Sequence, residues 1–98
     1  MPNCLEAIRF TVKPGCEEEL LSLRDRMLAD VRAKHDGLLR AELCRLDDGT
    51  YLDVLLWESK DHAERANADQ ENIAGFLAWV SNVQEVQAFK MSDVLHAG

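Results

Sequence analysis

Hydrophobic and polar positions alternate along residues 4–13, the first strand-like segment of the chain. Ile8 and Phe10 fall on one side of an extended backbone, while Ala7 and Arg9 fall on the other. A period of two is typical of a β-strand that covers a core with one of its faces. A Pro-Gly pair follows and signals a turn. We therefore predict a strand over this segment.

The period then changes from two to that of a helix. Three glutamates, residues 17–19, stand where the positive end of a helix dipole favours negative charge, and apolar residues recur at helical spacing from Leu20 to Val31. The segment His35-Asp36-Gly37 closes this pattern, and Gly37 suits the position just after a helix end. The pattern predicts one continuous helix.

Two further strand-like runs, LLRAELCRL (residues 38–46) and YLDVLLW (residues 51–57), follow the first helix. They are separated by Asp47-Asp48-Gly49-Thr50. An aspartate and glycine turn between two such runs is a strong hairpin signal. Residues 51, 53, 55 and 57 share one face of the second run, which we expect to face the helices.

A second helix is predicted to begin after Trp57, with either Ser59 or Asp61 as its N-cap. The polar stretch of residues 67–72 breaks this helix or exposes it. Apolar residues then resume at helical spacing over residues 73–80, and VQAFKM, residues 86–91, predicts a fourth strand.

The element order βαββαβ predicts an α+β fold, the ferredoxin-like arrangement of an antiparallel sheet with two helices on one face. We interpret residues 1–98 as a single domain of this type. The run from Leu52 to Leu56 is apolar on its other side as well, so the second face of the sheet needs a cover. A homodimer is the economical solution.

Composition narrows the range of partners. The formal net charge is −7, without a basic patch, which argues against nucleic acid as a partner. No apolar run reaches the roughly 18 to 20 residues that a bilayer requires, and the N-terminus does not resemble a secretory signal, so we expect no membrane partner and a cytoplasmic location. The three cysteines are interpreted as reduced thiols. The three histidines are widely spaced, so we predict no metal site.

Four short segments stand out in the predicted elements: the turn KPG (residues 13–15), the helix start EEEL (residues 17–20), the run GLLRAEL (residues 37–43) and the strand end WESK (residues 57–60). Together they resemble the antibiotic biosynthesis monooxygenase family of dimeric α+β barrels. The resemblance extends over about residues 4–95. It implies a pocket between sheet and helices, a small aromatic or quinol-like ligand, and oxidation of a phenolic or quinol substrate by molecular oxygen without metal, flavin or another cofactor.

The resemblance also implies residue roles. Trp57 occupies the tryptophan position of the family, and Asp53 stands where the best-known enzyme type has an asparagine. Ala63 stands where that type has a tyrosine, and its later arginine position falls near Gly75 or Phe76. A haem-degrading branch is disfavoured because the helix segment FLAWV contains no histidine.

Asp53 and Trp57 are the predicted catalytic residues, with Asp53 as a base or hydrogen-bond anchor and Trp57 as an aromatic wall. Because an isolated buried charge is costly, Asp53 is either functional or paired with Arg9, Arg45 or Lys90. For Trp57 the alternative is a large core side chain.

The predicted substrate-binding residues are Tyr51, His62, Asn67, Phe76 and Arg9. Asn67 either lines the mouth of the pocket or caps a helix break, and His62 is alternatively an exposed residue of the first helical turn. Arg9 reaches the pocket only if it shares the compartment of Asp53.

Two functional classes follow from the sequence. One is a cofactor-free oxygenase with an enclosed pocket that reaches Asp53 and Trp57. The other is a non-catalytic ligand-binding or assembly dimer, which is favoured if a salt bridge holds Asp53 and bulky side chains fill the pocket.

Overall fold

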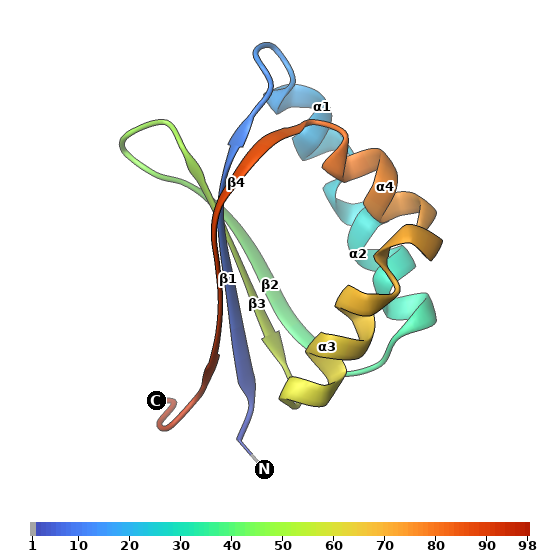
Figure 1. Cartoon of the computed structure of the whole chain (residues 1–98), viewed down its shortest axis with the longest axis vertical. Helices are drawn as coiled ribbons and strands as arrows, with labels where there is room; N and C mark the ends of the chain where they lie inside the picture. Colours follow the sequence, from blue (N-terminus) through green and yellow to red (C-terminus); the bar gives the residue numbers. More distant parts are fainter. Residues whose placement is uncertain (1) are drawn as a thin grey trace.

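A four-stranded sheet with helices on one face is the frame of the molecule, as the computed structural model shows for residues 2–98 (Figure 1). In chain order the elements are β1 (Cys4–Val12), α1 (Glu17–Ser22), α2 (Arg24–Lys34), β2 (Leu38–Arg45), β3 (Tyr51–Trp57), α3 (Lys60–Ala68), the short 3-10 helix η1 (Gln70–Asn72), α4 (Ala74–Val80) and β4 (Val83–Asp93).

The sheet has the strand order β2-β3-β1-β4, and each strand is antiparallel to its neighbours. The two central strands, β3 and β1, are therefore separated in sequence by a helical segment and a strand. Together with the helices on one face, this order confirms the predicted ferredoxin-like α+β fold.

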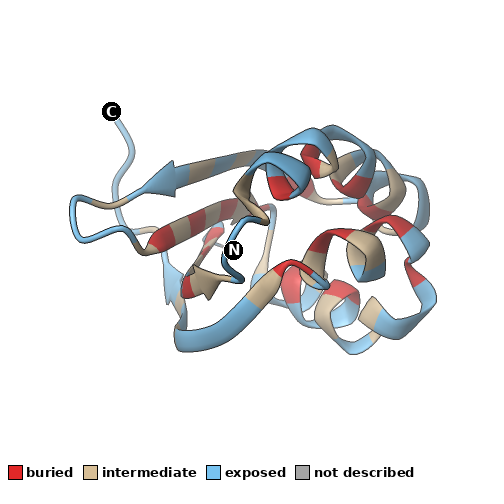
Figure 2. Cartoon of the chain, turned by 90° about the horizontal axis from the view of Figure 1, so that it is seen from above, coloured by how far each residue is buried: buried red, intermediate tan, exposed pale blue. Residues whose placement is uncertain are grey.

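Strand β3 shows which face of the sheet meets the helices. Its residues alternate between buried and partly buried, beginning with buried Tyr51, and Figure 2 shows the alternation as red and tan bands. Asp53 and Trp57 are both on the buried side, as the period of two predicts. Leu52 and Val54 are on the outer face, which no element of residues 2–98 covers.

The first helical segment is two helices, not the one continuous helix that the spacing predicts. Helix α1 ends at Ser22 and α2 begins at Arg24. The hydroxyl of Ser22 donates a hydrogen bond to the carbonyl oxygen of Glu19, at 2.9 Å. A serine that bonds back to the preceding turn competes with the regular helix pattern and bends it. The break is confined to Leu23, whose N–H still donates to the Glu19 carbonyl at 3.0 Å, and apolar spacing does not encode so local an irregularity.

The role predicted for Gly37 is corrected by the structure. Helix α2 ends at Lys34 with His35 as its C-cap, in an extended conformation, so Gly37 is not the first residue past the helix. Gly37 has a φ of +97°, and a Cβ atom there would overlap the ring of His62. Glycine is therefore required by backbone conformation and by close packing.

The second helical region begins and breaks near the predicted positions. Ser59, not Asp61, is the N-cap of α3, since its hydroxyl accepts a hydrogen bond from the His62 N–H at 3.3 Å. After α3 and η1, helix α4 starts where the Gly75 N–H donates to the Asp30 carboxylate at 2.8 Å. That hydrogen bond ties α4 to α2 and fixes one wall of the interior.

Strand β4 is longer than the predicted residues 86–91, because it begins at Val83 and ends at Asp93. Its pairing with β1 changes register twice, between Arg9 and Phe10 and between Thr11 and Val12. Such irregularities interrupt the alternation of side chains along a strand. The first residues of β4 therefore carry no clean strand pattern in the sequence.

Candidate active site

A cavity of about 420 Å³ lies between the sheet and the helices. This volume is within the range of roughly 300–1,000 Å³ that is typical of small-molecule sites. Strands β1 and β3 form its floor, helices α2, α3 and α4 form its other walls, and β4 contributes to its edge. Val86 and Phe89 of β4 line the cavity although each is about half exposed, 56% and 50%, so the cavity opens beside this edge strand.

Most of the cavity wall is apolar and aromatic, with side chains such as Phe10, Phe76 and Trp79. Of the described residues that line it, only Glu6 and Asp53 have ionisable side chains, and Asn67 and Gln70 add two amides. Apolar walls with a few convergent polar groups are typical of sites that orient a flat organic ligand.

Glu6 is the centre of a polar cluster at the cavity. Its Oε1 accepts a hydrogen bond from the Trp57 Nε1–H at 3.1 Å, and its Oε2 accepts one from the Asn67 Nδ2–H at 2.5 Å. The Gln70 amide in turn donates to Asn67 Oδ1 at 2.7 Å. The cluster joins β1, β3, α3 and η1 and fixes the orientation of the Glu6 carboxylate.

Burial changes the acidity of Glu6, whose exposed fraction is only 2%. Desolvation raises the pKa of the Glu6 carboxyl above its ordinary value, and the negative charge of Asp53 acts in the same direction. The hydrogen bonds from Asn67 and Trp57 lower it, but by less, so the net direction is upward. No cation contacts this carboxylate among residues 2–98.

Asp53 has a different environment. Both of its carboxylate oxygens accept hydrogen bonds from the Arg24 guanidinium, at 2.8 and 2.5 Å, and both side chains are nearly buried. The Arg24 guanidinium also lies over the ring of Trp79, 5.2 Å from its centroid. This two-point contact is the strong geometry for an arginine and a carboxylate.

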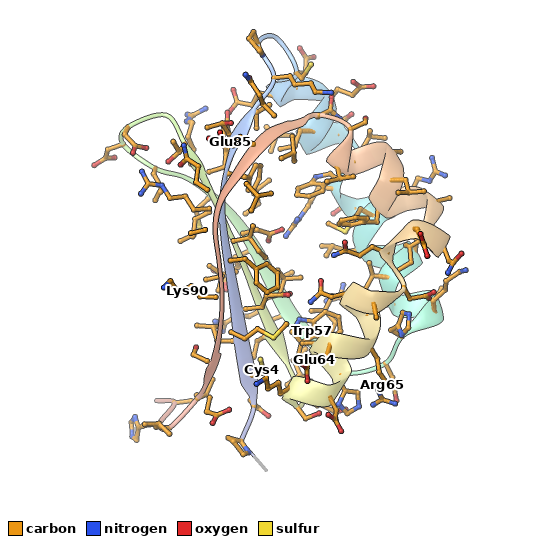
Figure 3. All side chains as sticks on the ribbon, in the orientation of Figure 1. Cys4, Trp57, Glu64, Arg65, Glu85 and Lys90 are labelled. Carbon is orange, nitrogen blue, oxygen red and sulfur yellow. The ribbon has the colours of Figure 1, made fainter. Side chains whose placement is uncertain are left out.

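The partner of Asp53 therefore differs from all three predicted candidates. Arg9 pairs with Asp48 at 2.5 Å, and Arg45 pairs with Glu17 at 2.6 Å. Lys90 lies on the outer side of β4 and points away from the helices (Figure 3). Arg24 lies within the predicted first helix, and nothing in the spacing of apolar residues indicated that its side chain is buried against β3.

The other predicted site residues divide into two groups. Trp57, Asn67 and Phe76 line the cavity, and Figure 3 shows Trp57 between the sheet and α3. Tyr51 is buried but stacks on Phe10, with 5.7 Å between ring centroids, outside the cavity lining.

Arg9 and His62 are also outside the cavity lining. Arg9 is exposed on the opposite face of the sheet. The Nδ1 of His62 lies 2.7 Å from the Ser59 hydroxyl, and its Nε2 lies 3.5 Å from Glu58. The structure thus brings together Asp53, Trp57, Asn67 and Phe76 but leaves Tyr51, Arg9 and His62 elsewhere.

Sequence reasoning missed Glu6, Arg24 and Gln70. A signal for Glu6 did exist, because it shares the strand face of Ile8 and Phe10 by the period of two. Within residues 2–98 no group of three or more His, Cys, Asp or Glu side chains is arranged to hold a metal ion. In the same range no helix has both the length and the apolar character that a membrane span requires.

The fold and the cavity define a ferredoxin-like α+β domain with an internal site of small-molecule size. The model of the antibiotic biosynthesis monooxygenase family matches residues 5–88, and the chain belongs to this family. The search of curated proteins found no match.

Three solved structures illustrate the likeness. SnoaB, a cofactor-independent oxygenase from Streptomyces nogalater, is 22% identical, with a TM-score of 0.76 over 99% of this chain and 97% of its own. Rv0793 from Mycobacterium tuberculosis is 21% identical, with a TM-score of 0.68 over 99% and 98%. A conserved protein from Methanosarcina mazei Go1 is 12% identical, with a TM-score of 0.72 over 95% and 93%. At these identities the likeness is one of fold.

Proposed function

We propose that the protein is an oxygenase that oxidises a phenolic or quinol substrate with molecular oxygen, in the cavity between sheet and helices. The observation that carries the proposal is the cavity of about 420 Å³ with aromatic walls and a cluster of polar groups around Glu6. Family membership and the fold shared with a cofactor-independent oxygenase support it.

The proposed reaction needs no external reductant. The substrate first loses a hydroxyl proton, which makes its ring electron-rich enough to react with oxygen. A ring carbon that carries one hydrogen in this hydroxyl form then becomes a carbonyl. One oxygen atom enters the product, and the other leaves as water together with that hydrogen and the hydroxyl proton. All four electrons accepted by oxygen come from the substrate. The protein's task is to bind the ring, accept the proton and keep water out.

The geometry suits this task. A flat ring lies against side chains such as Phe10, Phe76 and Trp79, and its hydroxyl reaches the polar cluster of Glu6 and Asn67. The buried pair of Arg24 and Asp53 favours the alternative, a ligand-binding domain without catalysis, because it removes one predicted base. Glu6 provides another carboxylate in the same cavity.

Thermal-shift screening of phenols, quinols and short-chain aldehydes, followed by oxygen uptake with each binder, tests the function. A ligand at 100 times its Kd stabilises the fold by about 2.7 kcal/mol. Val86→Trp should narrow the opening and weaken binding, whereas Leu77→Trp, at a residue of α4 outside the cavity lining, should not. Binding without oxygen uptake would favour the non-catalytic alternative, and equal effects of the two variants would contradict the proposed location.

We also propose that a second copy of the chain covers the outer face of the sheet. The central strands contribute Ala7, Leu52 and Val54 to this face, together with Arg9, which is paired with Asp48. Charges of both signs stand at its sides, Arg40 and Glu42 on β2 and Glu85 and Lys90 on β4. A two-fold axis allows such a face to complement itself.

Light scattering tests this assembly. The wild type should have the mass of a dimer, and Val54→Asp should have that of a monomer or should unfold. The control is Leu21→Asp, which places the same charge on an exposed residue of α1 and should leave the dimer intact. A folded wild-type monomer at micromolar concentration would contradict the homodimer.

A further inference from the structure

We propose that Glu6 is the catalytic base of the site, the group that takes the proton from the substrate hydroxyl. This inference rests on the proposed function and assigns to Glu6 the role for which the sequence favoured Asp53. The assignment follows from the contacts of the only two ionisable residues among the described residues that line the cavity.

The two carboxylates differ in what already occupies them. Both oxygens of Asp53 are engaged by the Arg24 guanidinium, which holds the group as a charged, buried pair. Each oxygen of Glu6 accepts one hydrogen bond, from Trp57 and from Asn67, and neither donor is charged. A carboxylate oxygen has two lone pairs, so each Glu6 oxygen retains one for a substrate hydroxyl.

The position of Glu6 is also fixed. Its carboxylate is held from both sides, by an indole of β3 and by an amide of α3 that is itself held by Gln70. A base that is oriented before the substrate arrives loses little entropy in the reaction. Trp57 and Asn67 are therefore positioning residues, which act through Glu6.

The charged and titratable groups around Glu6 agree with this role. Asp53 on β3 and Cys4 on β1 are its titratable neighbours, and Met91, its partner on β4, is neutral. The pKa of the Glu6 carboxyl is raised by burial first and by Asp53 to a smaller extent. A carboxylate whose pKa moves toward the working pH is a better proton acceptor.

The proton step balances within the site. The O–H bond of the substrate breaks, a bond forms between the proton and a Glu6 oxygen, and the electron pair stays on the substrate oxygen as a phenolate. The total charge of the pair stays the same. Oxygen adds to the ring carbon as a peroxide anion. The O–O bond and the C–H bond of that carbon then break, the carbonyl forms, and hydroxide leaves with the hydrogen of that carbon. The proton passes from Glu6 to this hydroxide, which gives water and restores the carboxylate.

Three variants test the assignment through the pH dependence of kcat/KM. The wild type should gain activity as pH rises through the raised pKa of Glu6. Glu6→Gln should lose about 100-fold or more and should lack this rise, while Glu6→Asp keeps a carboxylate and should keep the rise at lower activity. Asn67→Leu removes a donor that lowers the pKa, so the rise should move to higher pH.

Binding of 2-naphthol, followed by the fluorescence of Trp57 and Trp79, separates Glu6 from the oxygenase reaction. The affinity of the wild type should rise about tenfold as Glu6 ionises, because an ionised acceptor strengthens the hydrogen bond from the hydroxyl. Neither Glu6→Gln with 2-naphthol nor the wild type with 2-methoxynaphthalene, which lacks the hydroxyl, should show the rise.

The outcomes distinguish the two proposals. If Glu6→Gln retains the wild-type pH profile and affinity, Glu6 is not the base, even if phenols are oxidised. If 2-naphthol binding depends on Glu6 but no phenol or quinol supports oxygen uptake, the oxygenase function is wrong and Glu6 is the hydroxyl acceptor of a binding site.

Discussion

The variant Asp53→Asn should destabilise the fold without changing ligand affinity at a pH where Glu6 is fully ionised. The introduced asparagine would keep the shape of the aspartate and one oxygen for the Arg24 guanidinium, but it would leave the positive charge of that guanidinium nearly buried and unpaired. The exposed fractions of the two side chains are only 11% for Arg24 and 7% for Asp53. Removing one partner of a buried pair costs about 3–5 kcal/mol.

The lower end of that range applies, because one hydrogen bond to Arg24 survives in the variant. A loss of about 3 kcal/mol corresponds to a decrease of roughly 12 °C or more in Tm for a domain of this size. Urea unfolding at a fixed protein concentration measures the free energy directly, and the fixed concentration removes any contribution from association.

Two comparisons make the experiment specific to burial. Asp48→Asn removes the same type of charge from an exposed pair with Arg9 and should change stability far less. The double variant Arg24→Met with Asp53→Leu removes both charges and should recover most of the loss, because apolar side chains can replace a buried ion pair at little cost. An unchanged or higher Tm for Asp53→Asn, together with reduced turnover, would refute this reasoning and return Asp53 to the chemistry.

Three smaller perturbations follow from single contacts. Because the pKa of Glu6 is raised in the folded state, the folded form binds more protons than the unfolded form, and the free energy of unfolding should fall as pH rises through that pKa. Glu6→Gln should remove this dependence in unfolding curves measured between acid and neutral pH. Ser59→Ala should cost about 1 kcal/mol in urea unfolding, through loss of the α3 N-cap bond from the His62 N–H, and an unchanged midpoint would contradict that role. Gly37→Ala should destabilise more than Gly49→Ala, because both glycines have positive φ but only Gly37 contacts His62; equal losses in thermal melts would contradict the clash.

The order of elements and the faces of the strands were predictable because they depend on local periodicity. Alternation placed Asp53 and Trp57 on the face toward the helices, and the structure confirms that placement. The break at Leu23 was not predictable from spacing, since apolar residues recur at helical spacing on both sides of it. The early start of β4 was hidden by the register shifts in its pairing with β1.

The ion pair of Arg24 and Asp53 is a different kind of omission. The two residues are 29 positions apart, on α2 and β3, and their contact depends on how far the helix slides along the sheet. Local pattern does not encode that offset, so the sequence analysis predicted only strand residues, Arg9, Arg45 and Lys90, as possible partners of Asp53. Glu6, in contrast, stood on a predicted inward face, and its burial followed from the same alternation that placed Phe10.

One cavity therefore contains two carboxylates that the structure makes chemically unequal. Both oxygens of Asp53 accept hydrogen bonds from the Arg24 guanidinium, so its charge is compensated within a buried ion pair. Glu6 receives only neutral donors, and burial raises its pKa. Where environments separate two such groups, the one with the raised pKa suits proton transfer and the paired one suits structure. The negative charge of Asp53 still acts on Glu6 by raising its pKa, so an intact Arg24–Asp53 pair both supports the wall of the site and adjusts the base that we assign to it.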